Sequence, residues 1–186
     1  MKGALMKSSK SHGTLKVLFS SAITHDSLEC FYRKVIPRLT KSDHLELHID
    51  SRGGEVTVAL GLARFLVSLK GNVTTYNDGH CDSAAVVVFA SGKERVVWRG
   101  SQFVMHEVGI ETTGLHTLST LAKVQKVLRR DTERITRFLE RRTGRDALLW
   151  ECDMRRNRCL SVDMALRNGL VTQIGGTKTD GYSLTI

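Results

Sequence analysis

Segments with the hydrophobic period of a strand alternate along this chain with segments that have the period of a helix. Residues 43–50, DHLELHID, alternate apolar and polar side chains as a half-buried strand does, and they stop at a turn with two glycines. Residues 56–71 then carry apolar side chains at helical spacing and end in lysine and glycine, as helix termini often do. Because strands that alternate with helices build a sheet covered by helices, this rhythm predicts an α/β fold.

The same strand-to-helix order recurs before and after this unit. Residues 77–82, NDGHCD, are expected to form a loop, and residues 83–91 are so apolar on all sides that we expect a buried helix. Residues 117–143 break the rhythm with one long amphipathic helix, and a short helix, a polar loop, a helix and a strand close the chain. The remaining expected strands are residues 15–23, 72–76, 95–98 and 101–108, and the remaining helix is residues 24–39.

Length and composition favour one folded domain. The chain has 186 residues, of which 41% are hydrophobic and 25% charged, so we expect a polar leader, 1–16, followed by a single domain, 17–186. No apolar stretch reaches the roughly 18 residues that span a bilayer, and the start lacks a secretory signal, which predicts a cytoplasmic protein without a membrane contact. The four cysteines lack metal-ligand spacing, so we expect no metal and no cofactor.

The formal net charge of +9 raises the question of nucleic acid. Much of the excess lies in residues 127–145, where arginines alternate with Asp and Glu at helical spacing. That pattern is typical of a solvated or subunit-contacting helix face. We therefore do not expect this chain to bind nucleic acid.

Ser83 stands where a polar cluster meets the apolar helix, in GHCDSAAVVVFASG. Serine is a favoured helix N-cap, and this simple interpretation stays open. A serine at a helix start also suits nucleophilic catalysis, because the helix dipole and the free backbone N–H groups stabilise a developing oxyanion. The N–H of Ala84 is the local candidate donor.

A nucleophilic serine needs a base and a second oxyanion donor. His106, at the exit of an expected strand, is the candidate base, although a lone histidine there is more often structural. Gly54 in SRGG is the candidate second donor, because glycine presents its backbone closely to a substrate. An ordinary strand-to-helix turn explains the two glycines equally well, so the residues alone leave both interpretations open.

Taken in order, IDSRGG, GHCDSAA, VMHEV, the long charged helix and CDMRRNRCLSV resemble the ClpP family, the proteolytic subunit of the Clp protease. The resemblance extends from Val17 to Ile174. It implies a repeated ββα spiral like that of the crotonases, with a projecting handle helix at about residues 109–143. It further implies that Ser83 is the nucleophile, that His106 is the general base, and that the amides of Gly54 and Ala84 form the oxyanion hole.

The third catalytic position departs from the family pattern. When CDMRRNRCLSV is laid over the family's loop, Asn157 stands where the family has an aspartate. Asparagine can orient a histidine through its carbonyl oxygen, but it brings no negative charge to stabilise the imidazolium. We expect Asn157 to take the third role and to reduce the activity.

The resemblance implies a serine endopeptidase subunit of a compartmentalised protease that cleaves peptides or unfolded proteins through an acyl-enzyme on Ser83. The alternative is a catalytically weak or inactive subunit with a structural role in a mixed ring. An enzyme acting on acyl thioesters is a third hypothesis, which no carboxylate placed as an obvious acid or base beside Gly54 supports. The partners implied are further copies in stacked heptameric rings, and an AAA+ unfoldase or a ClpP-like paralogue.

Overall fold

The structure is a computed structural model that describes residues 13–39, 42–69, 72–175 and 181–186. Its main layer is a six-stranded sheet in the order β7-β4-β3-β2-β1-β8, in which every neighbouring pair is parallel. A separate antiparallel pair joins β5 to β6. The strands are β1 Gly13–Phe19, β2 Ser42–Ser51, β3 Val73–Cys81, β4 Glu94–Val97, β5 Gln102–Val104, β6 Cys159–Ser161, β7 Gln173–Ile174 and β8 Leu184–Thr185.

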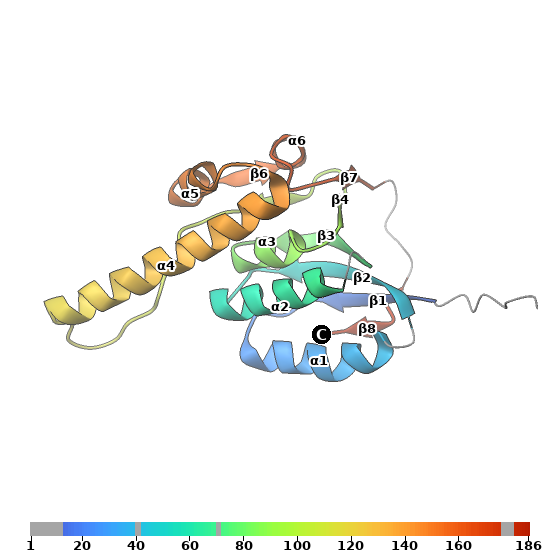
Figure 1. Ribbon diagram of the computed structural model, residues 1–186, viewed down its shortest axis with the longest axis horizontal. Helices are drawn as coiled ribbons and strands as arrows, with labels where there is room; N and C mark the ends of the chain where they lie inside the picture. The colour runs from blue at the N-terminus through green and yellow to red at the C-terminus, as the bar shows by residue number, and fades with distance from the viewer. Residues whose placement is uncertain (1–12, 40–41, 70–71, 176–180) are drawn as a thin grey trace, which may run out of the picture.

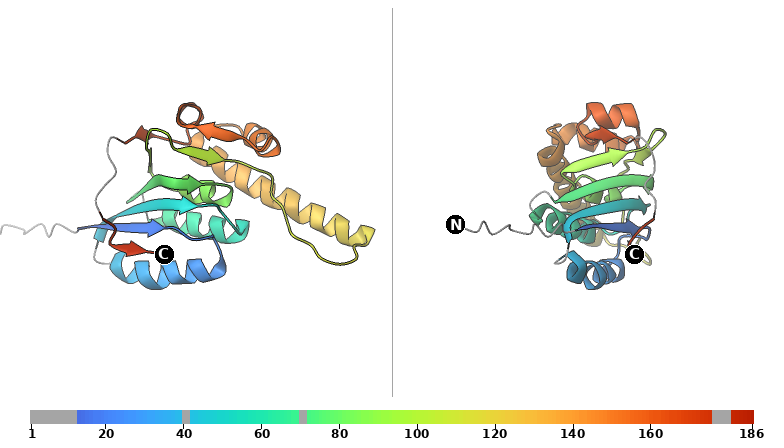
Figure 2. Two further views of the ribbon diagram at one scale, coloured as in Figure 1. Left: turned by 180° about the vertical axis from the view of Figure 1, so that it is seen from behind. Right: turned by 90° about the vertical axis from the view of Figure 1, so that its right-hand side faces the viewer.

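Helices connect the strands and cover the main sheet. Figure 1 shows α2 and α3 in front of the sheet, and the view from behind shows the strands in front of these helices (Figure 2). The expected leader is only partly placed, because β1 begins at Gly13 and residues 1–12 lie outside the described residues. The helices are α1 His25–Leu39, α2 Val56–Ser68, α3 Ala84–Phe89, α4 Leu118–Thr143, α5 Ala147–Arg155 and α6 Val162–Arg167.

The hydrophobic core includes β2, α2 and α3. All six residues of α3 are buried, as its apolar sequence predicts. Leu45, Leu47 and Ile49 of β2 are buried too, in agreement with their alternation. The sequence therefore identifies the core helix and the central strand correctly.

The expected loop at residues 77–82 is wrong for most of its length, because β3 continues to Cys81. Asn77 pairs with Ile49 of β2, and a bulge separates this pair from the pair of Ser51 with Cys81. Polar side chains are tolerated here because distant groups satisfy them: the Asn77 amide donates to the carbonyl oxygen of Gln102. Such non-local partners are invisible in the local pattern.

Helix α4 matches the long helix expected over residues 117–143, with Thr117 as its N-cap. Only its C-terminal half packs against the body, where Ile135 and Leu139 are buried. Leu118 and Leu121 of the outer half are 87% and 50% exposed, because this half projects away from the sheet (Figure 1). Within the described ranges, no helix is long and apolar enough to cross a membrane.

Two arginines, Arg142 of α4 and Arg95 of β4, bind the backbone carbonyls that follow α3. Arg142 donates to the carbonyl oxygens of Ala90, Ser91 and Gly92, which follow α3. Arg95 donates to the Gly92 carbonyl and to two carbonyls after α6. These bonds satisfy carbonyl groups that a helix end leaves without partners. Burial, and then the charge of Arg142, lowers the pKa of Arg95 to about 10.

A polar cluster lies between β2, β3 and β4 and the C-terminal segment. The Asp78 carboxylate accepts hydrogen bonds from His48 Nδ1, 2.9 Å away, from Trp98 Nε1, 2.8 Å away, and from the Tyr182 hydroxyl. Burial raises the pKa of Asp78, but the hydrogen bonds from His48, Tyr182 and Trp98 outweigh it and hold the pKa at about 2. Asp78 is therefore ionised and fixes the end of the chain against the sheet.

Candidate active site

Ser83 lies at the junction of β3 and α3 in a conformation that serine rarely adopts. Its φ is 55° and its ψ is −123°, a sparsely populated conformation that costs a non-glycine residue about 1–3 kcal/mol. Its N–H donates to the carbonyl oxygen of Val104, 2.7 Å away. Its hydroxyl does not cap α3, so the simple helix-cap interpretation is wrong for this side chain. Such strain clusters at functional sites.

The backbone N–H of Ala84 is a free donor beside this hydroxyl. Ala84 is the first residue of α3, and the next two N–H groups are used by the carbonyls of Asp82 and Ser83. Among the described residues, no acceptor is recorded for the N–H of Ala84. Ala84 therefore keeps the donor that the sequence predicts for it.

The turn after β2 requires both of its glycines. Gly53 has a φ of 95°, and a Cβ on it would stand 2.7 Å from the Asp82 oxygen and 2.9 Å from the Ser83 Cβ. Gly54 has a φ of 149°, and a Cβ on it would collide with the carbonyl oxygen of Ile23. Gly53 therefore allows the turn to touch the Ser83 junction, and Gly54 allows it to touch the backbone of Ile23.

The direction of the Gly54 N–H follows from the peptide that carries it. The Gly53 carbonyl accepts a hydrogen bond from Ile23 N, 2.8 Å away. In a trans peptide the N–H points opposite to the carbonyl, so the Gly54 N–H points away from Ile23. No acceptor for it is recorded in the described part of the chain. A second free donor thus borders the Ser83 junction.

His106 follows β5, as the sequence predicts, and its ring is set by its own backbone. Its Nδ1 lies 2.7 Å from the carbonyl oxygen of Glu107. A carbonyl only accepts, so Nδ1 carries the proton of this hydrogen bond. In the neutral ring Nε2 is then unprotonated and available as a base. Sequence reasoning missed the carbonyl of Glu107, because no side-chain pattern reveals a backbone contact.

One small cleft brings most of these groups together. It has a volume of about 90 Å³ and is lined by Gly54, Ser83 and His106. Among the described residues no hydrogen bond is recorded between Ser83 and His106, and such bonds are often long before substrate binds. Sequence reasoning missed the rest of the lining, which is mostly apolar and includes the buried Ile135 of α4. These residues are Val56, Met105, Val108, Gly109, Ile135 and Met154.

Asn157 is near the strand of His106 but outside the cleft lining. It has a φ of 48° in the turn between α5 and β6, and its N–H donates to the carbonyl of Met154. The β5–β6 register pairs Val104 with Cys159, and one further bond runs from Met105 N to the Arg158 carbonyl. Continued by one more step, this register would bring Asn157 opposite His106, although β6 itself begins at Cys159. No side-chain contact between the two is recorded in the described residues.

Buried ion pairs hold the loop that carries Asn157. The Asp153 carboxylate is almost fully buried and accepts from Arg145, 2.6 Å away, and from Arg158, 3.1 Å away. Arg145 also lies over the ring of Trp150, 4.5 Å from its centroid. The loop is therefore fixed on one side by Asp153 and on the other by β5.

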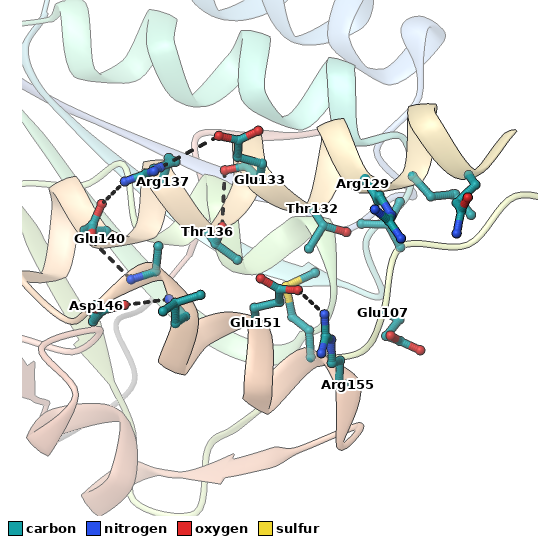
Figure 3. A pocket seen from close by; sticks show the side chains of 16 residues that line it. Glu107, Arg129, Thr132, Glu133, Thr136, Arg137, Glu140, Asp146, Glu151 and Arg155 are labelled. Atoms are coloured by element: carbon teal, nitrogen blue, oxygen red, sulfur yellow. Dashed lines mark hydrogen bonds and ion pairs between the residues drawn. The ribbon is translucent and has the colours of Figure 1, made fainter. Parts of the chain in front are cut away.

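A larger groove of about 860 Å³ runs between α4 and α5 and shares Val108 and Met154 with the cleft (Figure 3). Its walls carry charges of both signs. Arg137 lies 3.5 Å from Glu140, and Ala147 N donates to the same carboxylate. Within the described part of the chain, no group of three His, Cys, Asp or Glu side chains is placed to hold a metal ion.

Comparison with known families shows which family the chain belongs to. The sequence model of the family described as Clp protease matches residues 16–178. The chain belongs to the Clp protease family. This confirms the resemblance drawn from the sequence, and membership of the Clp protease family supports a ClpP-like peptidase subunit.

Several Clp protease proteins are similar to this chain. The ATP-dependent Clp protease proteolytic subunit 4 of Rhodococcus jostii is 27% identical over 133 residues, which cover 70% of this chain and 68% of that protein. Subunit 2 of Treponema pallidum is 24% identical over 172 residues, which cover 90% and 85%. An asparagine-to-aspartate mutant of ClpP1 from Listeria monocytogenes has a TM-score of 0.74 at 21% identity and covers 89% of this chain and 92% of its own. The structural match confirms the expected ClpP-like α/β fold.

Proposed function

We propose that this chain is a serine endopeptidase subunit that cleaves peptides or unfolded proteins through an acyl-enzyme on Ser83. The observation that supports this most strongly is the cleft in which the strained Ser83, His106 and Gly54 meet. The N–H groups of Gly54 and Ala84 are the donors for the oxyanion. Family membership supports the peptidase class of this proposal.

The reaction begins when His106 Nε2 takes the hydroxyl proton of Ser83. The serine oxygen attacks the peptide carbonyl carbon, and the carbonyl electrons move to an oxygen that accepts from Gly54 and Ala84. The imidazolium then gives its proton to the leaving amine, and the C–N bond breaks to leave an ester on Ser83. Water attacks this ester by the same route, with His106 as base, and releases the acid.

The orientation of His106 decides how fast this chemistry runs. In Ser-His-Asp enzymes, exchange of the aspartate for asparagine lowers turnover about 10⁴-fold, largely because it favours the wrong tautomer. In this chain the Glu107 carbonyl already selects the tautomer with its proton on Nδ1. We therefore propose that Asn157 leaves the charge of the imidazolium unsupported but that the loss is smaller than 10⁴-fold.

Hydrolysis and labelling of purified protein test the proposal. The wild type is expected to hydrolyse activated esters and short peptides and to react with a fluorophosphonate probe. Ser83→Ala should abolish all three, and His106→Ala should reduce them strongly. Ser119→Ala, at an exposed serine on α4, is the matched control and should behave as wild type. Equal activity in wild type and Ser83→Ala contradicts the proposal.

The second candidate is a subunit with a structural role in a mixed ring. Two observations favour it: Asn157 brings no charge to His106, and no Ser83–His106 hydrogen bond is recorded in the described residues. Asn157→Asp separates the candidates. A large gain in hydrolysis means that the rest of the site is competent, whereas inactivity of both proteins supports the structural role.

We further propose that copies of this chain associate into rings, stacked in pairs through α4, in the cytoplasm. The exposed Leu118 and Leu121 support association, since apolar residues on a projecting helix need a partner. An AAA+ unfoldase or a paralogous subunit is the expected further partner. The mass of the intact assembly tests ring formation. No Asp or Glu lines the described cleft, so nothing there favours an acyl-thioester enzyme.

A further inference from the structure

A chain of three polar side chains joins the ends of β2 and β3 just outside the cleft. Arg52 Nη2 lies 3.0 Å from His80 Nε2, and His80 Nδ1 lies 3.1 Å from an Asp50 carboxylate oxygen. The same oxygen accepts from the His80 backbone N–H, 2.7 Å away. Gly79 permits this approach, because a Cβ there would stand 2.5 Å from the carboxylate.

The directions of these hydrogen bonds are fixed by chemistry. A guanidinium group only donates, so His80 Nε2 accepts from Arg52. The neutral ring then carries its proton on Nδ1 and donates it to Asp50. The three residues thus form one continuous chain, Arg52 to His80 to Asp50, that requires an uncharged imidazole.

The hydrogen bonds between Arg52, His80 and Asp50 hold the turn that carries the oxyanion donor. Arg52 directly precedes Gly53 and Gly54, and His80 lies three residues before Ser83. On the inner side, the Ser51 hydroxyl accepts from Gly53 N and donates to the Ser21 carbonyl. The inner contact ties the turn to the segment after β1. The hydrogen bond between Arg52 and His80 ties the turn by side chains to the segment leading to Ser83, beside the backbone bond from Asp82 N to the Ser51 carbonyl oxygen.

We propose that Arg52, His80 and Asp50 are positioning residues that hold the Gly54 N–H at its distance from Ser83 and thereby set the rate of acylation. The inference rests on the proposed serine peptidase function. We expect the three residues to affect kcat and not KM. They do not line the cleft, and the donor that they hold binds the oxyanion most strongly in the transition state.

Solvent limits the effect of these three residues on kcat. Complete loss of one oxyanion donor costs about 10²–10³-fold in kcat. The side chains of His80 and Asp50 are 51% and 45% exposed, so water competes for their hydrogen bonds. Loss of these hydrogen bonds loosens the Gly54 N–H without removing it. We therefore expect kcat to decrease about tenfold.

The experiment compares Arg52→Ala, His80→Ala and His80→Gln with Arg64→Ala, an exposed arginine on α2. The readouts are the second-order rate of fluorophosphonate labelling of Ser83 and the kcat and KM for an activated ester. We expect both alanine variants at positions 52 and 80 to lose about tenfold in labelling rate and kcat, with KM within about twofold. His80→Gln should restore the rate, because its amide accepts from Arg52 and donates to Asp50.

The split between kcat and KM and the rescue by His80→Gln are readouts that a purely structural role would not give. Wild-type rates in both alanine variants overturn the inference and leave the proposed function intact, as does a raised KM with unchanged kcat. An unreactive wild type overturns the proposed function itself. Should His80→Ala fail to fold, Arg52→Ala at an exposed residue and His80→Gln decide the question.

Discussion

Gly53→Ala is the substitution that most sharply tests the contact between the glycine turn and the Ser83 junction. The new Cβ would stand 2.7 Å from the Asp82 carbonyl oxygen and 2.9 Å from the Ser83 Cβ, so backbone has to move. The left-handed φ of 95° costs a non-glycine residue about 1–3 kcal/mol. Overpacking against backbone adds about 1–3 kcal/mol. The free energy of unfolding should fall by roughly 2–6 kcal/mol.

The same substitution should slow the chemistry. Movement of the turn away from Asp82 and Ser83 carries the neighbouring Gly54 N–H with it, because Gly53 and Gly54 share one peptide. A displaced donor no longer meets the oxyanion, so labelling of Ser83 should slow by up to about 10²–10³-fold. The effect on KM should be small, since the donor acts mainly in the transition state.

Two further glycines serve as matched controls. Gly100 has a φ of 92° but nothing within 4 Å of a built Cβ, so Gly100→Ala measures backbone strain without a collision. Gly61 lies inside α2 with open space around it, and Gly61→Ala should stabilise the helix by about 1 kcal/mol. Neither control should change the labelling rate.

The assay is urea denaturation followed by circular dichroism, together with the fluorophosphonate labelling rate measured below the unfolding transition. The three variants are expected in the order Gly61→Ala, Gly100→Ala, Gly53→Ala from most to least stable. If Gly53→Ala is as stable and as reactive as Gly100→Ala, the turn does not press on the Ser83 junction and the reasoning fails.

Three other substitutions follow from the structure. Arg142→Ala removes donors to three carbonyls after α3 and should lower the free energy of unfolding by about 2–4 kcal/mol in urea denaturation, whereas exposed Arg141→Ala should change it little. Asp78 has its pKa lowered to about 2 in the folded chain, so its contribution, about 2 kcal/mol, is complete above about pH 4 and lost as the pH falls toward 2. Asp78→Asn should flatten that part of the stability profile, and an unchanged profile would contradict the assignment. Ile135→Ala widens the apolar cleft and should favour bulky over small residues on the acyl side of the scissile bond by about tenfold in kcat/KM, measured with paired peptides.

Much of the fold is readable from the sequence because its strongest signals are local. The apolar run 84–89 predicts a buried helix, and the alternation in residues 43–50 predicts the central strand, since each depends only on neighbours in the chain. The end of β3 was mispredicted because Asn77 is satisfied by a carbonyl 25 residues away. The outer half of α4 exposes Leu118 and Leu121, so the apolar spacing there indicates a helix without indicating its neighbour.

Part of the candidate site is likewise predictable from the sequence, and part of it is not. Ser83, His106 and Gly54 were found from residue type and order, and the structure places them at one cleft. The carbonyl that sets the tautomer of His106 leaves no trace in side-chain patterns. Asn157 was assigned from an aligned loop, and its third catalytic role stays a prediction, because its position opposite His106 comes from strand register and not from a recorded side-chain contact.

Mapping the fluorophosphonate adduct by peptide mass spectrometry decides whether Ser83 is the nucleophile. We expect one adduct, on the hydroxyl of Ser83, and a strongly reduced rate of its formation in His106→Ala. An adduct on another residue, or peptide hydrolysis by a protein whose Ser83 stays unmodified and dispensable, would contradict it.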